Sequence, residues 1–121
     1  YPFSAADFDN FEFSTSTMAG GTFTVGTGEA GVYTLGVATE CFNDAGVSRI
    51  AVFILVDKGV GYEAKAISTI GKPADLQSYE VPASWTGKLE VGDTVQFQGQ
   101  CITSSGTSTL NGIHPSIVKH A

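Results

Sequence analysis

The sequence predicts an all-β domain, an antiparallel β-sandwich, from three observations. Segments of alternating apolar and polar residues recur about every 8–12 residues. Glycine-rich turns separate these segments, and no segment has the apolar periodicity of a helix of useful length. A chain of 121 residues suits one domain with one hydrophobic core. We therefore expect an N-terminal arm or first strand over residues 1–21 and one head domain over residues 22–121.

Two segments show which face of each sheet points inward, because alternate residues of a strand lie on opposite faces. In residues 31–41 the inward set is Tyr33, Leu35, Val37, Thr39 and Cys41. In residues 92–101 the inward set is Val95, Phe97, Gly99 and Cys101, while Thr94, Gln96, Gln98 and Gln100 form a polar outer row. Both cysteines therefore fall on predicted inward faces.

The segments before residue 31 are short. Phe11 and Phe13 share one face of a first strand or ordered arm, and a small polar stretch follows over residues 14–21. Residues 22–25 are a short strand, and the turn at 26–30 leads into the next one. This glycine-rich turn lacks the Lys-Ser/Thr ending of a phosphate loop and precedes a strand instead of a helix, which argues against nucleotide binding.

Residues 47–57 are the most apolar strand of the chain. One face carries Ile50, Val52, Ile54 and Val56, and the other carries Ala51, Phe53 and Leu55. Because both faces are apolar, we expect the outer side to be covered by a loop or by another copy of the protein. In the following strand, residues 62–70, simple alternation places Tyr62, Ala64 and Ala66 on one face.

The last third of the chain carries the irregular strands. Tyr79, Val81, Ala83 and Trp85 share one face, and Pro82 between them has no amide hydrogen for a ladder, so this strand belongs at a sheet edge or carries a bulge. A tight turn follows at Gly92–Asp93, and residues 102–109 are a loop rich in serine, threonine and glycine. Asn111–Gly112 is either a hairpin turn or part of a bulged final strand.

The charge pattern limits the possible partners. The net charge is −6, and the six basic residues are scattered singly from Arg49 to Lys119, whereas nucleic-acid binding needs clustered cations. The longest apolar run, residues 50–56, is too short to span a bilayer, so no membrane insertion is expected. The acidic first half is a solvated surface, or a docking face for a basic partner or Ca²⁺. Since the chain begins at Tyr1, we expect a processed chain or a piece of a longer one.

No residue pattern points to catalysis, a cofactor or a metal. His114 and His120 lie six residues apart, which is not a metal-ligand spacing. A Cys-His nucleophile pair needs an exposed cysteine, and both cysteines are predicted to point inward. Acidic pairs such as Asp7 and Asp9 have no apolar sequence around them that would raise one pKa for acid catalysis. We expect a non-enzymatic protein without a cofactor.

Two motifs resemble a known family. The segment Gly31-Val32-Tyr33-Thr34-Leu35 resembles the Gly-x-Tyr-x-Phe strand of the jelly-roll heads shared by complement first-component and tumour necrosis factor-like proteins. Residues 89–97 resemble the Leu-x-x-Gly-Asp-x-Val-x-Leu step between two late strands of the same fold. The resemblance covers residues 22–119, and the glycine, serine and threonine content is similar to that of the bacterial and phage members. The proline in the last strand departs from the family pattern.

The resemblance implies a jelly-roll homotrimer that binds or displays and does not catalyse. It implies a virion component, such as a capsid decoration or a fibre or spike head, or a bacterial surface filament head. Its location would be the virion surface or the extracellular space, and its partners would be another virion or cell-surface protein or a host receptor or glycan. In that topology the two cysteine strands lie in opposite sheets and finish at the same end. A Cys41–Cys101 disulfide and two buried free thiols both stay open, since packed sheets lie about 10 Å apart and the bond needs Cα atoms within about 7 Å.

Two groups of residues are candidates for partner contacts. The loops after the two cysteine strands would share one end of the trimer, which makes Asn43, Asp44, Ser104 and Ser105 candidates for a partner-facing surface. The alternative function is a carbohydrate-binding β-sandwich module of a secreted protein. In that case Trp85, Tyr62 and Tyr79 are the aromatic side chains that would stack on sugar rings.

Overall fold

The protein is described here by a computed structural model that covers residues 13–43, 47–71, 77–103 and 108–120. Within these ranges, side-chain positions are considered for residues 13–39, 50–69, 80–99 and 114–120. The described part forms eight strands: β1 (Thr17–Ala19), β2 (Thr22–Thr24), β3 (Gly31–Asn43), β4 (Val47–Asp57), β5 (Tyr62–Gly71), β6 (Gln77–Leu89), β7 (Thr94–Thr103) and β8 (Ser108–His120). No helix in it is long and apolar enough to cross a membrane.

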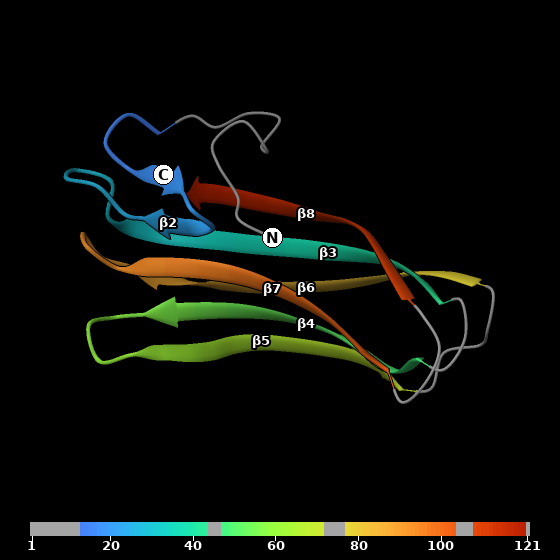
Figure 1. Cartoon of the computed structure of the whole chain (residues 1–121). Coiled ribbons are helices and arrows are strands. Elements are labelled where there is room, and N and C mark those ends of the chain that lie inside the picture. Colours follow the sequence, from blue (N-terminus) through green and yellow to red (C-terminus); the bar gives the residue numbers. More distant parts are fainter. Residues whose placement is uncertain (1–12, 44–46, 72–76, 104–107, 121) are drawn as a thin grey trace.

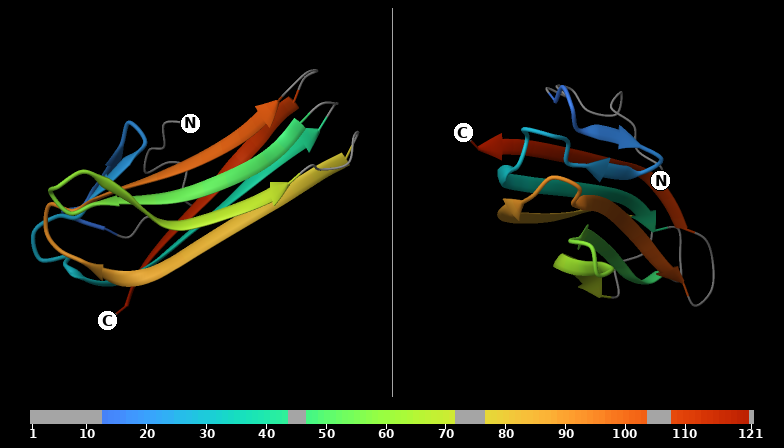
Figure 2. Two further views of the ribbon diagram at one scale, coloured as in Figure 1. Left: turned by 90° about the horizontal axis from the view of Figure 1, so that it is seen from below. Right: turned by 90° about the vertical axis from the view of Figure 1, so that its left-hand side faces the viewer.

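The strands form two antiparallel sheets that pack face to face (Figure 1). One sheet has five strands in the order β1-β2-β7-β4-β5, and the other has three in the order β6-β3-β8. The long strands of both sheets run along one common direction (Figure 2). The predicted antiparallel sandwich is confirmed.

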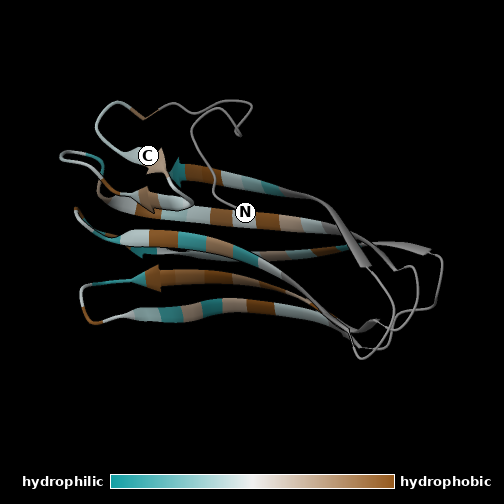
Figure 3. Ribbon diagram, in the orientation of Figure 1, coloured by the Kyte–Doolittle hydropathy of each residue, from teal (hydrophilic) through white to brown (hydrophobic). Residues whose placement is uncertain are grey.

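The core lies between the sheets and includes six residues of the predicted inward sets, namely Tyr33, Leu35, Val37, Thr39, Val95 and Phe97. Tyr33 and Leu35 of β3, Val95 of β7 and Ile50 of β4 are 0% exposed. Thr39 is also 0% exposed. The hydropathy colouring in Figure 3 shows β4 as the most continuously apolar strand. The sequence therefore predicts the inward-facing residues of a strand that contains no bulge.

The structure adds one strand that the sequence did not predict. Residues 17–19 form β1, which pairs with β2, where the sequence indicated only a polar stretch. Met18 of this strand is 5% exposed and belongs to the core, and the Phe13 ring packs against Phe23 and Tyr33 at centroid distances of 5.3 and 5.9 Å. A three-residue strand is too short to show a period of two, so its pairing is decided by β2.

A β-bulge corrects the predicted alternation of β5. The register of β4 and β5 shifts between Ile54 and Leu55, so that Ala66 pairs with Ile54 and Ala64 with Leu55, and Lys65 between them is the extra residue. Ala66 packs against the core, whereas Tyr62 is 43% exposed. The prediction that Tyr62, Ala64 and Ala66 share a face is therefore wrong, because one extra residue reverses the alternation.

Of the two irregular strands in the last third of the chain, β6 is an edge strand and β8 contains a β-bulge. β6 lies at the edge of the three-stranded sheet, as Pro82 predicted, and pairs only with β3 in that sheet. The β3–β8 register shifts between Glu40 and Cys41, and Asn111 is the residue skipped in the pairing. Asn111–Gly112 therefore lies inside a bulged final strand and is not a hairpin turn.

Candidate assembly face

The outer face of the three-stranded sheet carries three central rows that contain no Asp, Glu, Lys or Arg. Each row crosses β6, β3 and β8, and the registers define them as Thr86–Thr34–Val118, Ser84–Gly36–Ser116 and Pro82–Ala38–His114. We call these nine residues the uncharged face. They alternate with the inward set of β3, so the strand that builds the core also builds this face.

Small side chains occupy the middle strand of the uncharged face at Gly36 and Ala38. A Cβ atom on Gly36 would lie 2.7 Å from Ser116 Oγ, so the serine of β8 occupies the space above the glycine. The next row has only Ala38 at its centre, between Pro82 and His114. Small residues at the centre of a sheet allow another protein surface to approach the backbone closely.

A hydrogen-bonded row crosses the three strands at one side of this face. His120 Nε2 lies 2.6 Å from Thr34 Oγ1, which lies 2.9 Å from Thr86 Oγ1. Two apolar side chains flank this row, since Val118 is 52% exposed and Val32 is 45% exposed. The polar groups here are paired within the sheet, and the adjacent apolar groups are open to solvent.

Charged residues begin at both ends of the uncharged face. Lys88 is paired with Val32 in the row next to Thr34. At the opposite end, Glu80 is paired with Glu40 in the row next to Ala38. Burying unpaired charges is costly, whereas small side chains and hydrogen-bonded hydroxyls can be removed from water at lower cost. In a chain with 12 acidic and 6 basic residues, this arrangement is suited to contact with another protein surface.

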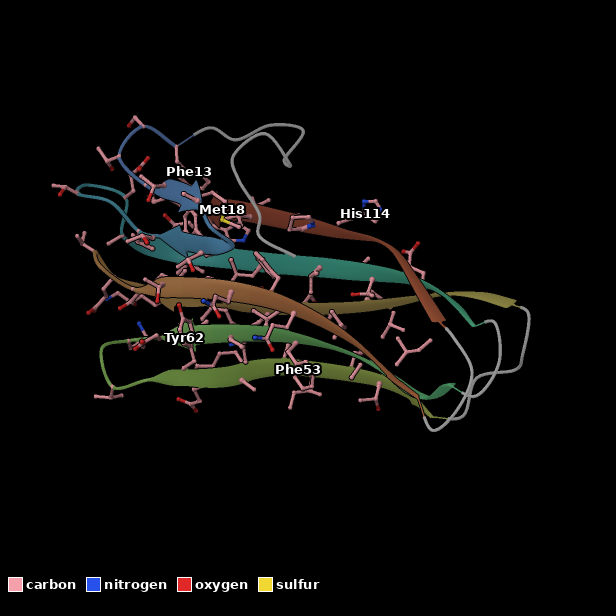
Figure 4. The ribbon with its side chains drawn as sticks, viewed as in Figure 1. Phe13, Met18, Phe53, Tyr62 and His114 are labelled. Carbon is pink, nitrogen blue, oxygen red and sulfur yellow. The ribbon has the colours of Figure 1, made fainter. Side chains whose placement is uncertain are left out.

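The outer face of the five-stranded sheet is a second partly apolar surface. Phe53 and Leu55 are half-buried on β4, but Ile67 and Tyr62 on β5 are 59% and 43% exposed. Figure 4 shows Phe53 and Tyr62 along this pair of strands. The Tyr62 hydroxyl accepts a hydrogen bond of 3.1 Å from Thr94 Oγ1. We expected the outer side of β4 to be covered, but Ile67 and Tyr62 of the neighbouring β5 remain exposed on this face.

The Glu29 carboxylate stabilises a turn at the end of the sandwich where β3 begins. Glu29 accepts hydrogen bonds from the Thr15 hydroxyl and from the backbone N–H groups of Thr15 and Ser16, at 2.7, 2.9 and 2.6 Å. The hydrogen bond from the Thr15 hydroxyl contributes most to lowering the pKa of Glu29, from 4.5 to about 2. Desolvation acts in the opposite direction, and the two N–H groups lower the pKa further. Glu29 thereby attaches the segment before β1 to the turn before β3.

The aromatic candidates for sugar binding do not form one platform. Trp85 points inward and packs against the core, and its ring fills the place that a side chain on Gly87 would need, with a Cβ distance of 2.1 Å. Tyr62 lies on the outer face of the other sheet. Tyr79 is paired with Cys41 in the backbone register, and its side chain is outside the described part.

Cys41 and Cys101 lie near the C-terminal ends of β3 and β7, two strands that finish at the same end of the sandwich (Figure 1). Cys41 is on β3 and Cys101 on β7, in opposite sheets as the resemblance implied. Their side chains fall outside the described residues, so the disulfide stays a prediction. Asp44, Ser104 and Ser105 also lie outside the described residues, and Asn43 is the last residue of β3. Within the described ranges no three His, Cys, Asp or Glu residues gather as metal ligands.

Sequence reasoning missed the uncharged face, although its signal is visible in the outward positions of residues 31–38. Val32, Thr34, Gly36 and Ala38 carry no charge, but their neighbours on β6 and β8 are known only from the register. It also missed Glu29, because the two segments that this residue joins lie 13 to 15 positions apart.

Comparison with known proteins shows the fold. No family model matches the chain, and no curated protein has a similar sequence. Murine APRIL, crystallised at pH 5.0, is similar in structure with a TM-score of 0.69 and 15% identity over 90% of this chain and 80% of that one. Eiger TNF from S. frugiperda is similar with a TM-score of 0.57 and 15% identity over 76% of this chain and 60% of that one. The chain has a tumour necrosis factor-like jelly-roll fold.

Proposed function

We propose that this chain is a non-enzymatic surface domain that assembles into a homotrimer and binds a receptor or another surface protein. The observation that carries this proposal is the uncharged face on the outside of the β6-β3-β8 sheet. A threefold assembly uses heterologous contacts, in which this face of one protomer meets a different part of the next and the ring closes. The jelly-roll fold and its resemblance to trimeric heads support the same arrangement.

The place of display is part of the proposal. Its basis is the resemblance to bacterial and phage heads, together with an acidic surface that favours solubility. We propose a virion component, such as a capsid decoration or a fibre or spike head, or a bacterial surface filament head. The partner would meet the end where β3 and β7 finish, because the predicted partner contacts, which include Asp44 and Ser105, follow these two strands in the sequence.

The test of assembly is the solution mass by light scattering at micromolar concentration. We expect about three times the chain mass of 12.6 kDa. Ala38→Glu places a charge on the central strand of the uncharged face and should give a monomer with an unchanged circular dichroism spectrum. The matched control is Gln98→Glu, an exposed position on β7, which should leave the trimer intact. A monomeric wild-type chain, or equal behaviour of the two variants, would refute this assembly face.

The alternative, a carbohydrate-binding module, is favoured by one observation. Tyr62 is 43% exposed on an outer sheet face, and its hydroxyl is held by Thr94, so the ring is available to stack on a sugar. Glycan binding by a monomer that Tyr62→Ala abolishes would support the module. Trp85→Ala is unsuitable for this test, because Trp85 packs against the core and its loss would destabilise the fold.

A further inference from the structure

We propose that Glu63 and Lys65 prevent the edge strand β5 from pairing with β5 of a second copy of the chain. Within the described part, β5 ends the order of the five-stranded sheet and pairs only with β4. The backbone groups on the other side of an edge strand can pair with another chain unless some feature of the strand prevents it. This inference does not depend on the proposed trimer, because it concerns a sheet edge and not the uncharged face.

Apart from these two residues, β5 has the composition of a strand that associates with other strands. It is 10 residues long, and residues 66–71 contain neither a charge nor a proline. Ile67 is 59% exposed and is paired with Phe53 of β4 in the register. A long edge strand with exposed apolar side chains favours pairing between molecules.

A β-bulge interrupts this edge at Lys65. Lys65 is the extra residue between Ala64, which is paired with Leu55, and Ala66, which is paired with Ile54. An extra residue bends the strand, increases its twist and breaks the regular spacing of its backbone groups. A second copy of β5 would meet this irregularity wherever it spans Lys65, so a continuous ladder along the whole edge is prevented.

Two charged side chains lie beside the bulge. Glu63 is paired with the core residue Val56, so its side chain starts on the face of the sheet that covers the core. Lys65 Nζ lies 3.3 Å from Glu63 Oε2, and the two side chains are 26% and 74% exposed. A strand added beside β5 would remove both charges from water, which costs free energy that an uncharged edge would not require.

The other edge strands of the described part carry comparable features. β1 has only 3 residues, β6 contains Pro82, and β8 contains Pro115 and a bulge. Short length, proline and bulges each limit pairing at a sheet edge. Because β5 is long and contains no proline, its protection depends on the bulge and on the two charges.

The experiment compares the wild type with the double variant Glu63→Thr with Lys65→Val by sedimentation velocity, over a micromolar-to-millimolar concentration series. The variant keeps the exposed outer face of β5 and replaces both charges by β-branched residues, which favour strands. We expect its mass to rise with concentration to at least twice that of the wild type. Hydrogen exchange read by mass spectrometry should show new protection in residues 62–71, because the edge amides would then bond to another chain.

The matched control is Lys88→Val with Glu90→Thr, because these two residues are also two positions apart and their charged atoms lie within 3.9 Å. It removes the same charges at the end of β6, and its mass should follow that of the wild type. Adding Ile67→Lys to the β5 double variant returns a charge to an exposed position of that strand and should abolish the association. Circular dichroism shows that each variant is folded.

An unchanged mass of the folded β5 double variant would overturn the inference. Equal association of the control would also overturn it, since the loss of a Lys–Glu pair anywhere would then be sufficient, and so would new protection confined to segments outside residues 62–71. If the double variant does not fold, Lys65→Gln is measured in the same way and decides between these outcomes. A monomeric wild type refutes the proposed trimer only, because this inference compares each variant with the wild type.

Discussion

Thr39 is a polar residue in an apolar position at the centre of β3. It is 0% exposed, and its hydroxyl has no hydrogen-bond partner within the described part of the chain. Thr39→Val keeps the shape and removes the unpaired hydroxyl, so the free energy of unfolding should rise by about 1 kcal/mol. Urea denaturation measures this change, with Thr17→Val at an exposed position of β1 as the matched control. An unchanged or lower midpoint for Thr39→Val would show that the hydroxyl is paired in solution.

Glu29 makes the fold sensitive to strong acid. Its pKa is lowered to about 2 in the folded chain from 4.5, so the ionised form is the one that folding stabilises. The stabilisation is therefore complete above pH 4.5 and is lost as the pH falls toward 2. We expect the melting temperature of Glu29→Gln to be lower than that of the wild type at pH 6 and to approach it at pH 2.

The control for Glu29 is Glu80→Gln, which changes an exposed carboxylate on β6. Scanning calorimetry at pH 6, 4 and 2 gives the melting temperature of all three proteins. If the difference between Glu29→Gln and the wild type did not shrink with acid, the carboxylate would not be the group that holds residues 14–16.

At the scale of elements, the turn between β6 and β7 depends on Asp93. This residue is 7% exposed, and its carboxylate accepts a hydrogen bond of 2.8 Å from the Glu90 N–H while it pairs with Lys58. Gly92 supplies the left-handed conformation with φ of 91°. The Gly-Asp step of the sequence is thus a turn closed by its own side chain.

Two substitutions separate the roles of Asp93. Asp93→Ala leaves the Glu90 N–H without its partner and should cost about 2 kcal/mol of unfolding free energy. Lys58→Ala removes an ion pair whose lysine side chain is 42% exposed, and should cost less than about 1 kcal/mol. Chemical denaturation of both variants gives the comparison. Equal losses would mean that the ion pair, and not the turn, dominates.

At the scale of the whole molecule, the predicted disulfide between the two cysteines would link the two sheets. Cys41 and Cys101 lie on strands of opposite sheets, and a bond between them would close a loop of about sixty residues and add about 4 kcal/mol in the chain-entropy model. We expect reductant to lower the melting temperature of the wild type but not of Cys41→Ser. Mass measurement in the same buffers shows whether the trimer is lost with the bond. No effect of reductant on the wild type would indicate two free thiols.

The sequence by itself determined the class of the fold and the inside of the sandwich. Residues such as Tyr33, Leu35 and Val95 alternate with polar or small residues. Because each strand buries its apolar side chains on one face, that face can be predicted from the residues of the strand alone. Pro82 likewise indicated an edge strand or a bulge, since proline has no amide hydrogen to donate to a neighbouring strand, and β6 is an edge strand.

Only the tertiary structure decided which outward residues lie together. The rows around Gly36 and Ala38 join three strands that are far apart in the sequence, and the bulge at Lys65 reverses the face of Tyr62. The hydrogen bonds of Glu29 and the packing of Trp85 against the core likewise depend on segments that folding brings together. The physical reason is that alternation is a property of one strand, whereas register, bulges and surface composition are set by pairing between strands.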